Sequence, residues 1–247
     1  MLHATTIGTG SRVVLVHGFT QTGRSWSPIV SGLSSQYEVV TIDLPGHGAS
    51  GPALDLWATA DELVATVGPA TYVGYSLGGR VALHAALAHP GAVERLVLLG
   101  ATAGIDDPAE RAERRAADEA LAAALERDGL DAFLDRWLAL PLFAGLPTEA
   151  AGLEERRTNT VAGLAGSLRL AGTATMDPPL WDRLASLTMP VLVLAGHHDH
   201  KFAALGRRLA AAIGANATFA SIEQAGHAAH LEQPAALLTL LAAFLPR

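Results

Sequence analysis

Cysteine is absent from this chain of 247 residues, which excludes disulfide bonds, thiolate catalysis and cysteine-ligated metal sites. The chain also lacks any apolar run of about 18 residues or more, and Met1-Leu2-His3 does not begin a charged and then apolar signal segment. The formal net charge is −7 without a basic stripe, which argues against nucleic acid as a partner. These absences predict a cytoplasmic protein that binds neither membrane nor nucleic acid.

The chain does contain abundant apolar residues, since half of it is hydrophobic, and no linker rich in Gly, Ser and Pro divides it. Short apolar runs of strand length alternate with segments of helical pattern, which predicts an α/β fold with a mostly parallel sheet covered by helices on both faces. The predicted strands are residues 2–6, 13–16, 39–42, 71–73, 96–99, 191–195 and 218–222. The predicted helices are residues 25–33, 54–67, 77–88, 202–213 and 234–245.

Residues 105–179 break this alternation, because they contain no strand run and three segments that read as helix (108–127, 130–140 and 149–170). We expect them to form a helical insertion, while residues 1–104 and 180–247 form the core.

The sequence G-Y-S-L-G-G at residues 74–79 lies between a predicted strand and a predicted helix. A serine flanked by glycines at such a turn is typical of a nucleophile elbow, in which Gly74 and Gly78 leave room for the tight turn and Ser76 Oγ is exposed. Because G-x-S-x-G also occurs by chance in a chain with 25 glycines, the prediction depends on the residues that could assist the serine.

Asp199 and His227 follow two later strand runs, where the carboxyl ends of parallel strands would bring them near Ser76. The order Ser, Asp, His along the chain is that of the α/β-hydrolases and differs from the chymotrypsin and subtilisin orders. We therefore predict a catalytic triad of Ser76, Asp199 and His227.

The strand run at residues 13–16 ends in His17-Gly18-Phe19, a loop that can supply a backbone N–H to an oxyanion hole. Phe19 N–H and Leu77 N–H, the latter directly after the nucleophile, are the expected donors. A simple turn after a strand is the alternative interpretation of His17-Gly18, and beside Ser76 it is the weaker one.

Two further features have competing interpretations. The run His197-His198-Asp199-His200 resembles a metal cluster, but adjacent residues do not readily converge on one ion and no second motif has zinc spacing, so we expect neither a metal nor a cofactor. Arg80 lies one helical turn after Ser76, where a guanidinium needs either a core carboxylate or an anionic substrate as its partner.

These motifs together resemble the α/β-hydrolase superfamily over the whole chain, and within it the family of 2-succinyl-6-hydroxy-2,4-cyclohexadiene-1-carboxylate synthases of menaquinone biosynthesis. The stretches that carry the resemblance are HGFT at 17–20, DLPGHG at 43–48, GYSLGGR at 74–80, PLF at 141–143, DHKF at 199–202 and GHAAHLEQP at 226–234. The sequence departs from that family at His197-His198, directly before the predicted acid.

The resemblance implies a lyase that eliminates pyruvate from a 5-enolpyruvyl-cyclohexene carboxylate, with the serine of the triad abstracting a proton. It implies Arg80, Arg114 and Arg157 as clamps for substrate carboxylates, with a register uncertain by one because Arg115 and Arg156 are arginines too. It also implies that Tyr75 and Trp137 line the pocket, and that residues 105–179 form a helical cap over the site, inserted after the sixth core strand, which sets the choice of substrate.

The expected partner is therefore a small anionic substrate, bound by a monomer or a small homo-oligomer. A carboxylesterase or a carbon–carbon bond hydrolase with the same triad is the alternative enzyme, and arginine in the pocket discriminates against it because esterase pockets are mostly apolar. A ligand receptor without catalysis is a third interpretation, which turnover of any activated ester would contradict.

Overall fold

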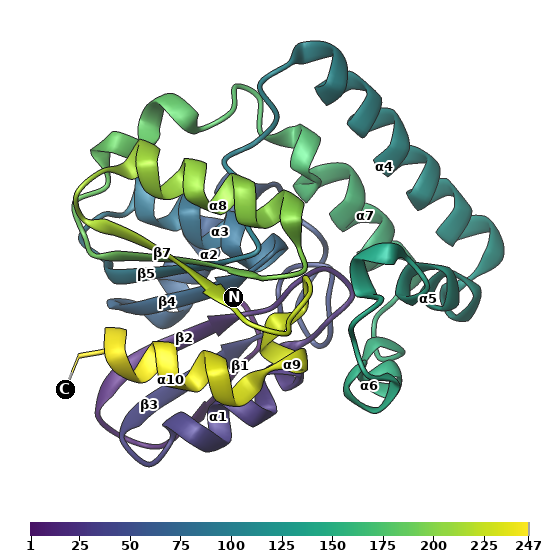
Figure 1. The fold of residues 1–247 in the computed structure, drawn as a ribbon. Coiled ribbons are helices and arrows are strands. Elements are labelled where there is room, and N and C mark those ends of the chain that lie inside the picture. Colours follow the sequence, from purple (N-terminus) through teal and green to yellow (C-terminus); the bar gives the residue numbers. More distant parts are fainter. Residues whose placement is uncertain (247) are drawn as a thin grey trace.

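A computed structural model of the chain describes residues 1–246, in which seven strands form one sheet of order β1-β3-β2-β4-β5-β6-β7 (Figure 1). Only β1 runs antiparallel, pairing with β3 at the sheet edge, and the other strands are parallel. The strands are β1 (Ala4–Ile7), β2 (Ser11–Val16), β3 (Tyr37–Ile42), β4 (Ala70–Tyr75), β5 (Val93–Leu99), β6 (Val191–Gly196) and β7 (Ala217–Ile222).

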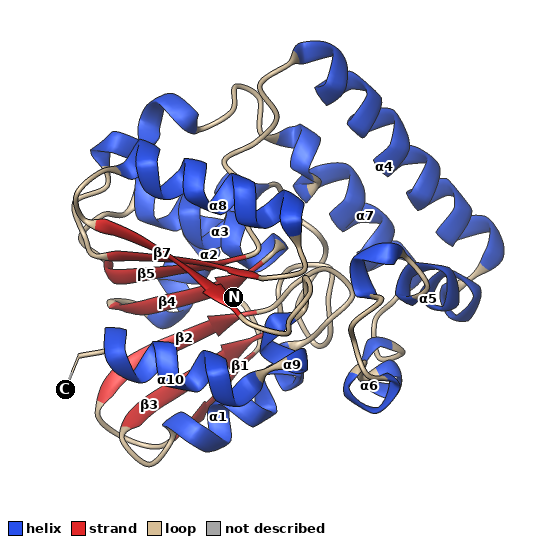
Figure 2. Cartoon of the chain, viewed as in Figure 1, coloured by secondary structure: helices blue, strands red, loops and turns tan. Residues whose placement is uncertain are grey.

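Helices cover both faces of this sheet, as the sequence predicts (Figure 2). The side chains of β2 alternate, so that Val14 and Val16 pack in one apolar core while Val13 and Leu15 pack in the other. The first core includes α2 (Leu56–Val67), α3 (Leu77–Ala88) and α8 (His200–Ile213). The second includes α1 (Ser27–Leu33) and α10 (Pro234–Phe244), with the short helix α9 (Ala229–Glu232) just before α10.

Residues 105–179, which we call the helical insert, contain α4 (Pro108–Asp128), α5 (Leu130–Leu138), α6 (Leu153–Arg156) and α7 (Val161–Ala171). The insert has an apolar core of its own, in which Leu125 of α4, Phe133 of α5 and Leu164 of α7 are buried together. Figure 1 places these helices to one side of the sheet, beside the carboxyl ends of the parallel strands.

The insert follows β5, so the prediction that it follows the sixth strand is wrong. The five strand runs predicted before residue 105 all correspond to strands, β1 to β5, so the N-terminal segment supplies one strand where a sixth-strand position would need two.

The prediction of one continuous helix over residues 149–170 is also wrong, because the chain turns between α6 and α7. Thr160 begins α7 by accepting a hydrogen bond from Gly163 N–H (3.0 Å), and a threonine in that role lies outside the helix. Gly152 before α6 is left-handed, with φ 64°. The turn brings Asn159 against the core, where it makes the contacts described below.

No helix within residues 1–246 is both long and apolar enough to cross a membrane.

Candidate active site

Ser76 lies at the turn between β4 and α3, with backbone angles φ 51° and ψ −107°. A non-glycine residue at positive φ is strained, and here the turn is so tight that a Cβ on Gly74 would lie 2.3 Å from the Gly78 carbonyl oxygen. A Cβ on Gly78 would lie 2.1 Å from the Val16 carbonyl oxygen of the neighbouring strand. Both glycines are therefore required for the elbow that presents Ser76.

The structure brings the three predicted triad residues together. Ser76 Oγ lies 3.2 Å from His227 Nε2, and His227 Nδ1 lies 2.6 Å from Asp199 Oδ2. Asp199 also caps α8, since its Oδ1 accepts a hydrogen bond from Phe202 N–H (3.3 Å). This geometry suits a base that takes the serine proton while the carboxylate holds the imidazole in one tautomer.

The backbone on both sides of His227 is held by one carboxylate that the sequence analysis did not single out. Glu232 accepts hydrogen bonds from Gly226 N–H (2.6 Å) and from Ala228 N–H (3.0 Å). Because two bonds span the histidine, they restrain the direction in which its ring leaves the loop.

The peptide group between Gly18 and Phe19 is fixed by its carbonyl. Gly18 O accepts hydrogen bonds from His17 Nδ1 (2.8 Å) and from Gln21 N–H (3.2 Å), and the Phe19 N–H of the same trans peptide points the opposite way. Within residues 1–246, Phe19 N–H and Leu77 N–H donate to no protein acceptor. Both residues line the cavity beside Ser76, so both amides are available to a substrate oxygen.

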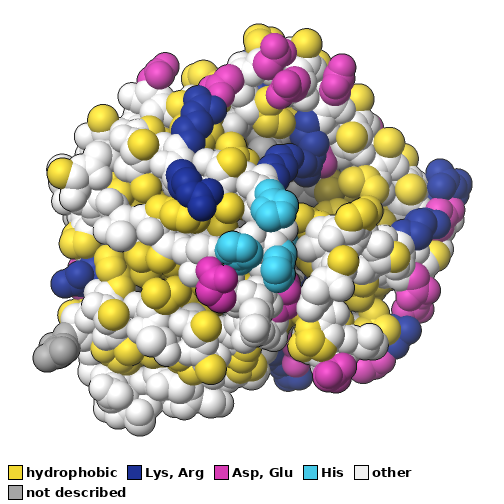
Figure 3. Space-filling view, viewed as in Figure 1, with side chains coloured by type: hydrophobic (Ala, Val, Ile, Leu, Met, Phe, Trp, Pro, Cys, Tyr) yellow, Lys and Arg dark blue, Asp and Glu magenta, His cyan; other side chains and the backbone are white. Residues whose placement is uncertain are grey.

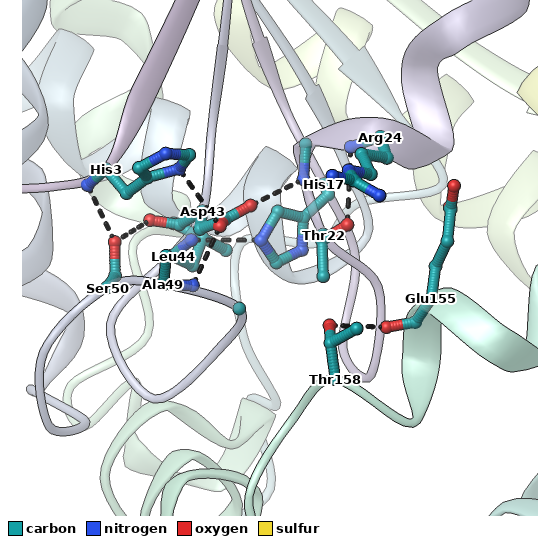
Figure 4. A network of polar contacts seen from close by, with 12 residues as sticks. His3, His17, Thr22, Arg24, Asp43, Leu44, Ala49, Ser50, Glu155 and Thr158 are labelled. Carbon is teal, nitrogen blue, oxygen red and sulfur yellow. Dashed lines mark hydrogen bonds and ion pairs between the residues drawn. The ribbon is translucent and has the colours of Figure 1, made fainter.

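His17 and His47 are neutral hydrogen-bonding groups beneath this loop. Burial lowers the pKa of His17 to about 4, and its Nε2 accepts from Leu44 N–H (2.9 Å), as Figure 4 shows. Burial lowers the pKa of His47 to about 3, and its Nε2 accepts from Thr20 N–H (3.3 Å). Asp43, the neighbour of Leu44 in Figure 4, accepts from Gly23 N–H and Ala49 N–H and so fixes the adjoining loops.

These buried histidines predict that the protein loses stability as the pH falls from about 6.5 to 5. Their pKa is lowered in the folded state, so the unfolded chain takes up protons first as the pH falls. At pH 5 each histidine lowers the free energy of unfolding by about 2 kcal/mol. Urea unfolding at pH 7 and pH 5 tests this prediction. We expect His47→Gln to reduce the difference and the exposed-site control His200→Gln to leave it unchanged; equal pH dependence in both variants would contradict it.

A cavity of about 370 Å³ lies between Ser76 and the helical insert. Its lining combines residues of the core loops with residues of α4, α5, α6 and α7. Its charged lining residues, the triad apart, are Arg80, Arg114, Asp118, Arg156 and Lys201. Its apolar lining residues include Phe19, Leu121, Trp137, Leu140, Leu142 and Phe143.

Arg80 is buried at the wall of this cavity and has no ion pair within residues 1–246. Its Nη2 donates to the Ala171 carbonyl (3.0 Å), whereas its Nε has no acceptor among the described residues. Burial, with the nearby Arg114 charge, lowers the pKa of Arg80 to about 10, so the side chain stays charged at neutral pH. The buried Asp118 carboxylate is near enough for its charge to raise the pKa of Arg80, but it forms no ion pair with Arg80 within residues 1–246, which favours an anionic ligand.

Arg114 lines the cavity, whereas Arg115 donates to the Ala174 carbonyl (2.9 Å) and does not line it. Arg114 Nε donates to Asp118 Oδ1 (2.9 Å), one helical turn later in α4. Burial raises the pKa of Asp118, and its Oδ2 has no hydrogen-bond donor within residues 1–246. The choice between neighbouring arginines is thus decided by which side of α4 faces the cavity.

Arg157 does not reach the cavity, and this corrects its predicted place as a substrate clamp. Its side chain is 40% exposed and is held at the surface by Asp131 (2.7 Å) and Glu154. The preceding residue, Arg156, is buried, lines the cavity and donates to the Ala151 carbonyl (2.7 Å) and to Thr20 Oγ1. Both arginines lie at the end of the short helix α6, where a shift of one residue changes the face by about 100°.

Tyr75 and Trp137 both line the cavity, as expected. The Tyr75 ring lies 5.3 Å from the His227 ring, and the Trp137 ring lies 5.1 Å from the Phe19 ring, measured between centroids. Trp137 Nε1 is buried without an acceptor in residues 1–246, so it is a further donor on the insert side of the site.

The exposed histidines His197, His198 and His200 form a surface group near the predicted acid, where Figure 3 shows histidine side chains on one face of the molecule. His197 Nδ1 lies 3.3 Å from Glu223 Oε1. Among the described residues, no group of three or more His, Cys, Asp or Glu side chains is arranged to hold a metal ion.

Sequence reasoning missed several cavity residues. Lys201 belongs to the DHKF stretch at 199–202, which carries the family resemblance but does not by itself indicate that the lysine lines the cavity. Asp118 follows Arg114 by four residues, a spacing that indicates a helical ion pair and could have found it. No sequence pattern indicates Gln21, which lines the cavity only because of the course of the loop after β2.

The sequence of residues 13–240 matches the alpha/beta hydrolase family. The chain is 36% identical over 248 residues to the 2-succinyl-6-hydroxy-2,4-cyclohexadiene-1-carboxylate synthase of Salmonella schwarzengrund (strain CVM19633). That alignment covers 94% of this chain and 93% of the relative.

Two solved structures are similar over nearly the whole chain. MenH from S. aureus aligns with a TM-score of 0.92 and 31% identity, covering 99% of this chain and 98% of that one. A thermophilic esterase from Thermogutta terrifontis, with malate bound, aligns with a TM-score of 0.81 and 25% identity, covering 98% and 92%.

Proposed function

Because this chain belongs to the alpha/beta hydrolase family, we propose that it is a 2-succinyl-6-hydroxy-2,4-cyclohexadiene-1-carboxylate synthase of menaquinone biosynthesis. In this proposal the enzyme is a lyase that releases pyruvate from a 5-enolpyruvyl-cyclohexene carboxylate. The helical insert acts as a cap that selects the substrate.

The proposed reaction uses Ser76 as a base. His227 Nε2 accepts the Ser76 proton, Asp199 stabilises the imidazolium, and the serine oxygen removes a proton from a ring carbon of the substrate. The resulting enolate oxygen is held by Phe19 N–H and Leu77 N–H. When the enolate collapses, the carbon–oxygen bond to the enolpyruvyl group breaks, and the departing enolpyruvate becomes pyruvate by gaining a proton from His227 through Ser76.

The observation that carries the proposal is the charge of the cavity. Arg80, Arg114, Arg156 and Lys201 line it together, and Asp118 is the only carboxylate among its lining residues. Guanidinium groups bind carboxylates with charge-assisted and often bidentate hydrogen bonds, which suits a substrate that carries several carboxylates. A neutral ester would offer no carboxylate to these cations.

Release of pyruvate by the purified protein tests the proposal. The unstable substrate is generated in the same cuvette, and pyruvate is followed with lactate dehydrogenase and NADH. We expect kcat/KM for this substrate to exceed that for a neutral aryl ester by at least about a hundredfold, the effect of two charge-assisted contacts at their lower strength. Ester hydrolysis without pyruvate release would overturn the proposal.

A carboxylesterase is the second candidate, and the apolar part of the cavity favours it. Leu121, Leu140, Leu142 and Phe143 line the same cavity, where they could accept an acyl chain. In that case Ser76 would attack the ester carbonyl directly and His227 would protonate the leaving alcohol. The same assay separates the two candidates.

A further inference from the structure

The residue after Phe19 is held in an unusual conformation. Thr20 has φ 67°, a left-handed backbone that β-branched residues rarely adopt, and it is completely buried. Such a conformation persists only when the surroundings determine it, so the contacts of Thr20, together with those of the Gly18 carbonyl, place the adjoining Phe19 N–H.

Thr20 N–H donates to His47 of the core, and the other two contacts of Thr20 come from the helical insert. Asn159 Nδ2 donates to the Thr20 carbonyl (2.8 Å), and Arg156 Nη1 donates to Thr20 Oγ1. Asn159 Oδ1 accepts from Gly48 N–H (2.9 Å), so the same amide also holds the loop after β3. Asn159 is 5% exposed and does not line the cavity.

The backbones of core and insert approach closely at this place. A Cβ on Gly163 would lie 2.3 Å from the Gly46 carbonyl oxygen, and a Cβ on Gly46 would lie 2.6 Å from the Gly163 carbonyl oxygen. Because both residues are glycine, the turn before α7 lies near enough to the core for the short Asn159 side chain to span the gap.

We propose that Asn159 is a positioning residue for the oxyanion hole. It holds Thr20, and through Thr20 the adjoining Phe19 N–H, in place. The geometry of the oxyanion hole therefore depends on docking of the insert against the core. The inference rests on the proposed function insofar as that function uses Phe19 N–H. An asparagine fits this role because one amide donates to Thr20 and Arg156 carbonyls and accepts from Gly48, leaving none of its polar atoms unpaired.

The test compares Asn159→Ala and the isosteric Asn159→Asp, which keeps an acceptor for Gly48 but no longer donates to Thr20. We expect kcat for pyruvate release to fall roughly 10- to 100-fold, less than the outright loss of an oxyanion donor, with KM changed by less than about twofold. Labelling of Ser76 by a fluorophosphonate probe should slow by a similar factor, because that reaction also develops charge on an oxygen in the hole.

Asn216→Ala is the matched control. Asn216 Nδ2 likewise donates to two backbone carbonyls, of Leu187 (2.9 Å) and Met189 (2.6 Å), but outside the cavity. A raised KM with unchanged kcat, or rates no lower than those of Asn216→Ala at equal melting temperature, would overturn the inference. If the wild-type protein released no pyruvate, the proposed function would fail, whereas the labelling rates would still decide the role of Asn159.

Discussion

Replacing Ser76 with alanine is expected to lower kcat for pyruvate release by roughly a thousandfold or more. Asp199→Asn and His227→Ala should cause losses of similar order, because the three side chains are joined by two hydrogen bonds and act as one unit. For the same reason the losses should not add when two changes are combined. Within residues 1–246, no other hydrogen-bonded chain runs from a serine hydroxyl through a histidine ring to a carboxylate.

The measurement is steady-state kinetics of the four proteins, with circular dichroism as a check on folding. Ser27→Ala is a suitable control, since Ser27 is an exposed serine that donates only to the Arg24 carbonyl. Activity of Ser76→Ala within about tenfold of wild type would rule out Ser76 as the base or nucleophile, given what the loss of such a residue costs.

The second large effect is expected at the cavity arginines. If Arg80 and Arg114 each bind a substrate carboxylate, Arg→Ala at either position should lower kcat/KM by about 1.5–3 kcal/mol, the range for hydrogen bonds to charged groups. Arg156→Ala should lower it at least as much, because Arg156 also donates to Thr20 beside the proposed oxyanion hole. Lysine should not restore these contacts where they are bidentate.

Two comparisons make this prediction specific. Arg157→Ala alters the neighbouring arginine, whose partners Asp131 and Glu154 lie at the surface, and it should leave kcat/KM unchanged. For a neutral aryl ester, kcat/KM should be unchanged by Arg114→Ala but lowered by Arg156→Ala. Folded Arg80 and Arg114 variants with wild-type activity on the anionic substrate would refute the clamps and favour the esterase.

Much of this fold follows from local pattern. The apolar runs at 13–16, 96–99 and 191–195 lie in parallel strands buried on both faces, where continuous hydrophobicity is required. The helix at 77–88 has the predicted bounds because Ser76 ends the strand and the next turn begins at once. The predicted residues around Ser76 are also brought together, since each follows the carboxyl end of a strand.

The insert was harder to predict, because its geometry depends on contacts distant in sequence. Whether Arg156 or Arg157 enters the cavity depends on a four-residue helix, and periodicity over one turn does not fix a face. The turn at Asn159 interrupts a segment of helical composition, and its partners Thr20 and Gly48 lie more than 100 positions earlier. No local pattern reports such a contact.

The triad and most of the cavity wall lie in different segments of the chain, which has a consequence for how such an enzyme evolves. Ser76, Asp199 and His227 are encoded outside the helical insert, whereas Arg114, Trp137 and much of the remaining cavity wall are encoded within it. One contiguous stretch of the gene therefore carries most of the surface that meets the substrate, together with the Asn159 contact that secures it. Exchange of that stretch by recombination would supply a new specificity to an unaltered triad, but only if the incoming segment also brought a side chain able to hold Thr20.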